Sequence, residues 1–202
     1  MTLIDEKTIL SFIKRGERIL FLKDVRLTPS ARDLLRKHRL TIVPEGSDYI
    51  PAPGDVRRVI IGSDHGGFEL KRILAERLNA AGFTVIDAGT GSPEVVDYPD
   101  FALEVARSVA EGKADRGVMI DSIGVASAMV ANRLRGVRAA PCWNTEVARS
   151  ARSHNDANVI TLGGKIITPD QAWEILRTFL REPFSGGRHE RRVRKIEAIS
   201  KL

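Results

Sequence analysis

The chain has 202 residues, of which 43% are hydrophobic, and it carries a net charge of +6 and one cysteine, Cys142. This length supports one full domain and a small additional unit. A single cysteine excludes an intrachain disulfide and is typical of a reducing compartment. No secretory signal is predicted, and no apolar run is long enough to cross a membrane. We therefore expect a cytoplasmic protein that has no membrane partner.

Much of the positive charge lies near the C-terminus, in residues 188–195. A basic balance is compatible with nucleic acid, an acidic surface or a phosphorylated small molecule as the partner. Val193, Ile196 and Ile199 recur at helical spacing, which predicts an amphipathic helix with a solvated, charged face. Aromatic residues make up only 5% of the chain, and nucleic-acid binding usually requires them or a recognisable reading motif. We therefore expect no nucleic-acid partner.

Residues 1–50 are predicted to form a small α/β unit. Apolar residues at positions 4, 9, 10 and 13 indicate a short helix, and residues 19–22 indicate a strand. Thr28 and Pro29 are typical of a helix start, so we expect a helix over 30–38 and a second strand over 40–43. Residues 51–56 have the composition of a linker. A unit of this size has little core, so we expect it to dock on the main domain or on another subunit.

From residue 57 to residue 202, strand and helix patterns alternate. The short apolar strands and the helices between them are typical of right-handed crossovers in a buried parallel sheet. We therefore predict an α/β fold with a Rossmann-like, open, parallel five-stranded sheet flanked by helices, a small N-terminal α/β appendage and a C-terminal helical tail. The predicted strands cover 58–61, 83–87, 117–121, 137–141 and 158–162, and the predicted helices lie near 67–80, 99–111, 126–134, 145–153, 169–181 and 189–200.

Polar residues gather next to the predicted strands. Asp64 and His65 follow the first strand, Asp121 ends the third, His154 and the residues after it precede the fifth, and Lys165 follows the fifth. We expect one edge of the sheet to collect these side chains, as a site for a polar ligand requires. Each residue alone also has an ordinary explanation as a helix cap or turn residue.

Metal and nucleotide sites are not predicted. His65, His154 and His189 lack the close spacing of metal ligands. The chain contains neither G-x-G-x-x-G nor G-x-x-x-x-G-K-[ST], so it lacks the dinucleotide-binding and ATP-binding signatures. We expect no metal and no cofactor.

Five segments of the main domain occur in the order found in a known family. They are residues 62–71 (Gly-Ser-Asp-His-Gly-Gly-Phe-Glu-Leu-Lys), 96–100 (Val-Asp-Tyr-Pro-Asp), 131–133 (Ala-Asn-Arg), 154–158 (His-Asn-Asp-Ala-Asn) and 186–193 (Gly-Gly-Arg-His-Glu-Arg-Arg-Val). Together they resemble the ribose-5-phosphate isomerase B / galactose-6-phosphate isomerase family. The resemblance implies aldose–ketose isomerisation of a sugar phosphate, with ribose 5-phosphate and ribulose 5-phosphate as the expected pair. Residues 27–35 are similar to N-terminal segments of bacterial microcompartment enzymes, which adds a microcompartment lumen to the expected locations.

The resemblance also implies roles for individual residues. His154, with Asp64 nearby, matches the position that opens the sugar ring. His65, Arg188 and Arg192 match phosphate contacts, and the tail of one subunit completes its partner's site in a homodimer or tetramer. The remaining expected substrate contacts are Tyr98, Ser122, Gly124, Asn155 and Lys165. At position 165 an arginine is frequent in the family, and lysine keeps the charge without the bidentate fork.

The loop after the third strand departs from the family pattern. Family members commonly read Cys-Gly-Thr-Gly-Ile-Gly there, with the cysteine as the base at C2, whereas residues 121–126 read Asp-Ser-Ile-Gly-Val-Ala. Some relatives place a glutamate where this chain has Ser127, and Cys142 lies elsewhere. In one interpretation Asp121 is the base, with burial raising its pKa. In another, the altered loop binds a sugar phosphate without turning it over, or acts on a different sugar. Binding of an unrelated ligand is a third alternative.

Overall fold

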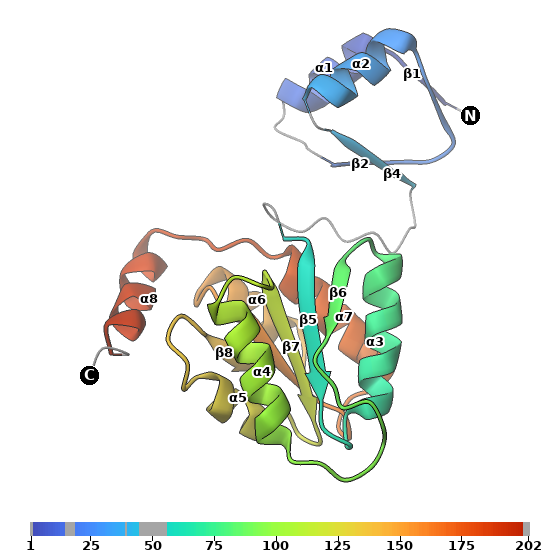
Figure 1. Ribbon diagram of the computed structural model, residues 1–202. Coiled ribbons are helices and arrows are strands. Elements are labelled where there is room, and N and C mark those ends of the chain that lie inside the picture. Colours follow the sequence, from blue (N-terminus) through green and yellow to red (C-terminus); the bar gives the residue numbers. More distant parts are fainter. Residues whose placement is uncertain (1, 15–18, 39, 45–55, 200–202) are drawn as a thin grey trace. The chain divides into compact units, whose positions relative to one another are not determined.

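The computed structural model of the protein describes residues 2–14, 19–38, 40–44 and 56–199 (Figure 1). The chain divides into two compact units, Met1–Tyr49 and Ile50–Leu202. Residues 51–55 of the expected linker lie outside the described residues. Among the described residues, no helix combines the length and the apolar character that a bilayer crossing needs.

The N-terminal unit contains two parallel strand pairs and two helices. Strand β1 pairs with β3, β2 pairs with β4, and Ile9 and Leu20 are buried in a small core between the elements. The expected cap at Thr28 is confirmed, because its Oγ1 accepts a hydrogen bond from the backbone N–H of Ala31 at 3.2 Å. Ile4 lies in β1 and not in a helix, because α1 starts only at Glu6. The elements are β1 (Thr2–Ile4), α1 (Glu6–Lys14), β2 (Ile19–Leu22), β3 (Val25–Leu27), α2 (Pro29–Lys37) and β4 (Thr41–Pro44).

The main unit contains the predicted five-stranded parallel sheet, in the strand order β6-β5-β7-β9-β8. Its strands are β5 (Arg58–Ser63), β6 (Thr84–Asp87), β7 (Arg116–Asp121), β8 (Ala139–Pro141) and β9 (Val159–Gly163). Its helices are α3 (Phe68–Ala80), α4 (Tyr98–Ala110), α5 (Val125–Ala131), α6 (Thr145–Ser153), α7 (Pro169–Arg181) and α8 (Arg188–Ile199). The α/β fold class and the C-terminal helix are therefore confirmed.

The helices cover both faces of this sheet (Figure 1). Successive side chains of a strand point to opposite faces, so the apolar strand residues divide into two cores. Ile61, Ile120 and Leu162 pack with α3, α6 and α7. Ile60 and Met119 pack on the other side, with α4 and α5. Burial on both faces explains why the strands read as continuous apolar runs.

The two edges of the sheet carry different predicted site residues. Asp64, Asp121 and Lys165 follow β5, end β7 and follow β9, so they lie at the carboxyl edge. His154 lies between the end of α6 and the start of β9, which places it at the amino edge, and Asn155 follows it. The expectation that all these side chains gather at one edge is therefore wrong for His154 and Asn155.

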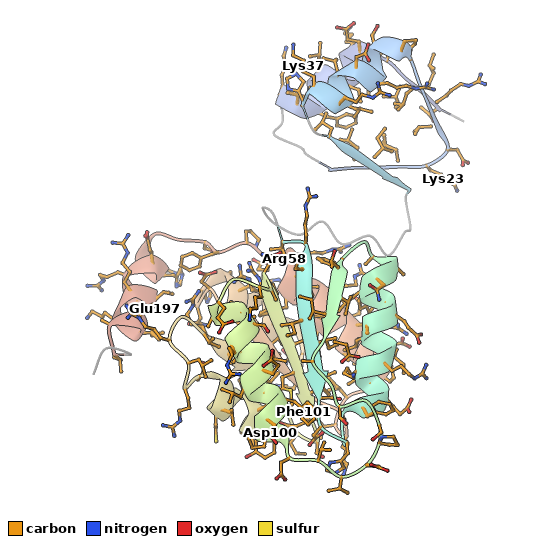
Figure 2. The ribbon with its side chains drawn as sticks, viewed as in Figure 1. Lys23, Lys37, Arg58, Asp100, Phe101 and Glu197 are labelled. Atoms are coloured by element: carbon orange, nitrogen blue, oxygen red, sulfur yellow. The ribbon has the colours of Figure 1, made fainter. Side chains whose placement is uncertain are left out.

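The register of the sheet shows how far apart the edges are. Asp121 pairs with Gly163, the last residue of β9, whereas His154 precedes Val159, its first residue. At about 3.3 Å per residue, β9 alone separates the two positions by about 13 Å. Figure 2 marks the two edges with Arg58, at the amino end of β5, and Asp100, in the first turn of α4.

Candidate active site

Three loops meet at the carboxyl edge of the sheet. The backbone N–H of Lys165 donates to the carbonyl of Ser122 at 3.1 Å, which joins the loop after β9 to the loop after β7. The loop after β5 approaches them at Gly66, where a Cβ atom would lie 2.4 Å from the Ser122 hydroxyl oxygen. A side chain at position 66 would therefore require the Ser122 hydroxyl to move. The three loops therefore form one polar surface.

Asp64 and His65 form the part of this surface that follows β5. Asp64 is 6% exposed, and its Oδ1 accepts a hydrogen bond from the N–H of Gly67 at 3.1 Å, just before α3. His65 is half-buried, and the N–H of Val96 donates to its Nδ1 at 3.4 Å. A neutral imidazole that accepts at Nδ1 carries its proton on Nε2. His65 therefore presents an N–H donor, which suits a phosphate oxygen.

Asp121 is 5% exposed, and both of its carboxylate oxygens accept hydrogen bonds from its own loop. Oδ1 accepts from the N–H of Ile123 at 2.8 Å and from the N–H of Gly124. Oδ2 accepts from the N–H of Ser127 at 3.0 Å and from its hydroxyl at 2.5 Å. Backbone N–H groups that converge in a loop in this way can stabilise an oxyanion. In this structure they hold the Asp121 carboxylate.

The hydrogen bonds reverse the pKa shift expected for Asp121. Burial by itself raises the pKa of this carboxyl, but hydrogen bonds from Ser127, Gly124 and Ile123 together outweigh burial. The pKa therefore lies below its ordinary value of 3.8. The raised pKa expected from burial is wrong, because the folded loop supplies four donors to the ionised form. Asp121 is consequently a carboxylate near neutral pH.

The other residues expected at this edge differ in exposure. Ser122 is half-buried, and Lys165 is exposed. Gly124 is buried at the start of α5 with φ +89°, a conformation that favours glycine. Tyr98 is half-buried and packs against the core under α4. The structure thus places Ser122, Gly124 and Lys165 in the joined loops and Tyr98 at the α4 start.

A second group of predicted residues lies at the amino edge. His154, Arg188 and Arg192 are exposed there, as is Asn155, and helix α8 is joined to the sheet through an ion pair between Glu197 and Arg138. Figure 2 labels Glu197 on α8. The rings of His154 and His189 are stacked, with centroids 4.3 Å apart and planes at 8°. His189 is a residue that sequence reasoning did not assign to the site. Its position next to Arg188, within the segment 186–193, is the signal that could have identified it.

Comparison with known proteins decides the family. The profile described as Ribose/Galactose Isomerase matches residues 59–196. The chain belongs to the ribose/galactose isomerase family. It is 39% identical over 144 residues to ribose-5-phosphate isomerase B of Escherichia coli (strain K12), covering 71% of this chain and 97% of that protein.

Solved structures of isomerases agree with this family. The chain is 48% identical to ribose-5-phosphate isomerase B of Clostridium thermocellum, with a TM-score of 0.71 over 71% of this chain and 97% of that chain. It is 39% identical to the enzyme of Mycoplasma genitalium with bound ribulose-5-phosphate, with a TM-score of 0.70 over 71% and 96% of the two chains. The isomerase fold therefore occupies the main unit, and the family match begins at residue 59.

The isomerase domain carries no cluster of metal ligands in its described part, and neither does the described part of the N-terminal unit. No group of three or more histidine, cysteine, aspartate or glutamate side chains is placed to hold a metal ion among these residues. Cys142 is buried, and burial raises the pKa of its thiol to about 12. A thiol with this pKa is protonated at neutral pH and is a poor nucleophile or base.

Proposed function

We propose that the protein interconverts ribose 5-phosphate and ribulose 5-phosphate. The observation that carries the proposal is the likeness to solved ribose-5-phosphate isomerase B structures, one of which has ribulose-5-phosphate bound. Asp64, His65 and Lys165 at the carboxyl edge, and Arg188 and Arg192 at the amino edge, supply the polar and cationic groups that a sugar phosphate requires.

The two groups of residues belong, in our proposal, to one site that two copies of the chain build together. Within one chain, Asp121 and His154 lie at opposite edges of the sheet, about 13 Å apart along β9 alone. One small sugar phosphate cannot contact both edges of the same sheet. In a two-fold symmetric dimer, the carboxyl edge of each copy faces a patch of its partner, and two identical sites form.

The surface around the carboxyl edge supports this arrangement. Five apolar side chains on the loops after β7, β8 and β9 and on α5 are 45–65% exposed, and we call them the apolar rim. Large contiguous apolar patches on a protein surface are typical of interfaces. A second copy that covers the rim brings its own groups beside Asp64 and Asp121. The apolar rim consists of Ile123, Val125, Met129, Trp143 and Ile166.

Each edge then has a share of the chemistry. Ring opening moves a proton from the anomeric hydroxyl to the ring oxygen, and we assign this step to His154 of one copy with Asp64 of the other. His65, Arg188 and Arg192 bind the phosphate, because cations and N–H donors stabilise its charge. The Asn155 amide, the Tyr98 hydroxyl and the Lys165 ammonium are proposed to bind the sugar hydroxyls and the phosphate.

We assign the isomerisation step to Asp121. The base removes the proton from C2 of the open-chain aldose, a C1–C2 double bond forms, and O1 becomes an oxyanion. Transfer of the O2 proton to O1, together with return of the abstracted proton to C1, gives the ketose with its C2 carbonyl and its C1 hydroxyl. The oxyanion needs N–H donors, and those of Ile123 and Gly124 are held by Oδ1 of Asp121. When the substrate oxygen takes over these donors, Oδ1 loses two hydrogen bonds and becomes more basic.

A second candidate function follows from the same hydrogen bonds. If the carboxylate keeps its four donors when the sugar is bound, the loop has no N–H group for an oxyanion, and Asp121 stays a weak base. The protein would then bind a sugar phosphate without converting it. The hydrogen bonds of Asp121 within its loop favour this alternative specifically.

One pair of measurements separates the candidates. The first is conversion of ribose 5-phosphate to ribulose 5-phosphate. The second is exchange of a C1 proton of ribulose 5-phosphate with deuterated water, which reports enediolate formation without any ring step, because this ketose is open-chain. The isomerase proposal predicts both activities. Tight binding of the sugar phosphate in calorimetry without conversion or exchange supports the second candidate and contradicts the first.

A further inference from the structure

His154 and His189 form a stacked pair that joins helix α8 to the end of α6. Their ring centroids are 4.3 Å apart, and their planes are nearly parallel, at 8°. The Ser150 hydroxyl lies 3.2 Å from Nδ1 of His154. Beside the stack, the N–H of Ser185 donates to the carbonyl of Ser153 at 3.0 Å, which fixes the chain that leads into α8. Both the plane of the His154 ring and its rotation in that plane are therefore restrained.

Arg188 determines which nitrogen of His189 carries the proton. Its Nε–H donates to Nε2 of His189 at 3.4 Å. A guanidinium has only donors, so Nε2 must be the bare nitrogen and Nδ1 must carry the hydrogen. Burial lowers the pKa of His189, and the neighbouring His154, Arg188 and Arg192 lower it further. His189 is therefore a neutral ring near pH 7.

We propose that His189 is a positioning residue for the ring-opening histidine. Its neutral ring is the platform on which His154 lies, and its hydrogen bond to Arg188 connects that platform to a phosphate contact. The inference rests on the proposed function, because that function makes His154 the group that opens the sugar ring and Arg188 a phosphate ligand. The inference adds a connection between Arg188 and His154, in which Arg188 orients His154 through the His189 ring.

The geometry is tested by nitrogen-15 NMR of the histidine rings in the full-length protein, which needs no activity. We expect His189 to be neutral near pH 7.5 with its proton on Nδ1, and we expect upfield ring-current shifts for the His154 ring protons. His189→Ala removes these shifts, whereas His189→Phe keeps them because a phenyl ring also stacks. A proton on Nε2 of His189, or unchanged His154 shifts in His189→Ala, overturns the proposal.

The functional role is tested by the two activities defined above. A ring displaced by about 1 Å costs up to about 100-fold in rate, so His189→Ala should lower kcat for ribose 5-phosphate by at least about tenfold. Exchange at C1 of ribulose 5-phosphate should be unchanged, because it requires no ring opening. His189→Phe should restore most of the conversion. Arg194→Ala, an exposed substitution on the same helix, is the matched control.

Two results overturn the positioning role. One is an equal loss of conversion and exchange in His189→Ala, which indicates general damage to the site. The other is a His189→Phe variant that is as slow as His189→Ala, which shows that stacking is not what His154 needs. If the unmodified protein converts no sugar phosphate, the proposed function fails, and the NMR experiment still decides whether His189 fixes the ring of His154.

Discussion

Replacement of Asp121 by asparagine tests whether this carboxylate acts as the catalytic base or only holds its loop in place. The asparagine carbonyl can still accept from the N–H groups of Ile123 and Gly124, but its NH2 group cannot accept from the N–H of Ser127, as Oδ2 does at 3.0 Å. The Ser127 hydroxyl, which donates to Oδ2 in the unmodified protein, can rotate and accept from the NH2 group instead. One hydrogen bond to a charged group is then lost, which costs about 1.5–3 kcal/mol. Domains of this size are usually stable by about 5–15 kcal/mol, so the variant should remain folded.

The activity of Asp121→Asn should fall much more than its stability. General-base catalysis contributes about 100- to 10,000-fold, so exchange at C1 of ribulose 5-phosphate should drop at least about 100-fold. Binding of the sugar phosphate should be largely unchanged in calorimetry. Exchange at the rate of the unmodified protein would refute the assignment of Asp121 as base and leave it the role of holding its loop.

The stability difference between the two proteins should also depend on pH. The pKa of Asp121 in the folded protein is below its ordinary value, and the unfolded value is about 3.9. A carboxyl whose pKa is lower in the folded protein stabilises the fold at pH values above its pKa in the unfolded chain. This contribution is lost as the pH falls through its pKa in the folded protein. The advantage of the unmodified protein over Asp121→Asn in urea unfolding should therefore be constant near neutral pH and shrink below about pH 4. An advantage that grows on acidification would contradict the hydrogen bonds described.

Three further outcomes are expected. The double variant Arg188→Ala, Arg192→Ala should bind ribose 5-phosphate about 100-fold more weakly in calorimetry, because two charge-assisted contacts are lost. If binding of unphosphorylated ribose weakens equally, the phosphate assignment is contradicted. Iodoacetamide at pH 7.5 should leave Cys142 unmodified by mass spectrometry, because burial raises its pKa to about 12, and rapid labelling of the folded protein would contradict this. Asp87→Ala should lower the free energy of unfolding by about 1–3 kcal/mol, because it leaves the buried Lys71 ammonium without the carboxylate that it contacts at 2.5 and 2.7 Å. A loss below about 0.5 kcal/mol would indicate an ordinary surface pair.

Much of the main unit could be predicted from the sequence because apolar strands and amphipathic helices alternate regularly along it. Strands β1 and β3 could not, because three residues are too few to show a period of two. The sequence pattern therefore does not separate Ile4, in β1, from the apolar residues of α1. Thr28 and Pro29 identified the start of α2 because cap and first-turn preferences are local.

The placement of His154 was open to prediction from the topology. In a parallel sheet, a helix after one strand returns the chain to the amino edge for the next strand. Residues between the end of α6 and Val159 therefore had to lie at the amino edge, away from Asp64 and Asp121. The hydrogen bonds of Asp121 were harder to foresee, because they depend on the exact path that brings Ser127, six residues later, back to the carboxylate.

Complementation between two inactive variants tests most directly the claim that the site is built from two copies. Co-expression of Asp121→Asn and His154→Gln chains with different affinity tags allows the mixed dimer to be isolated. One of its two sites then contains both replaced residues, and the other contains neither. The proposal predicts that the mixed dimer converts ribose 5-phosphate at about half the rate of the unmodified dimer, although each variant alone is inactive. A mixed dimer as inactive as the two parents would show that Asp121 and His154 act from the same chain or do not share a site.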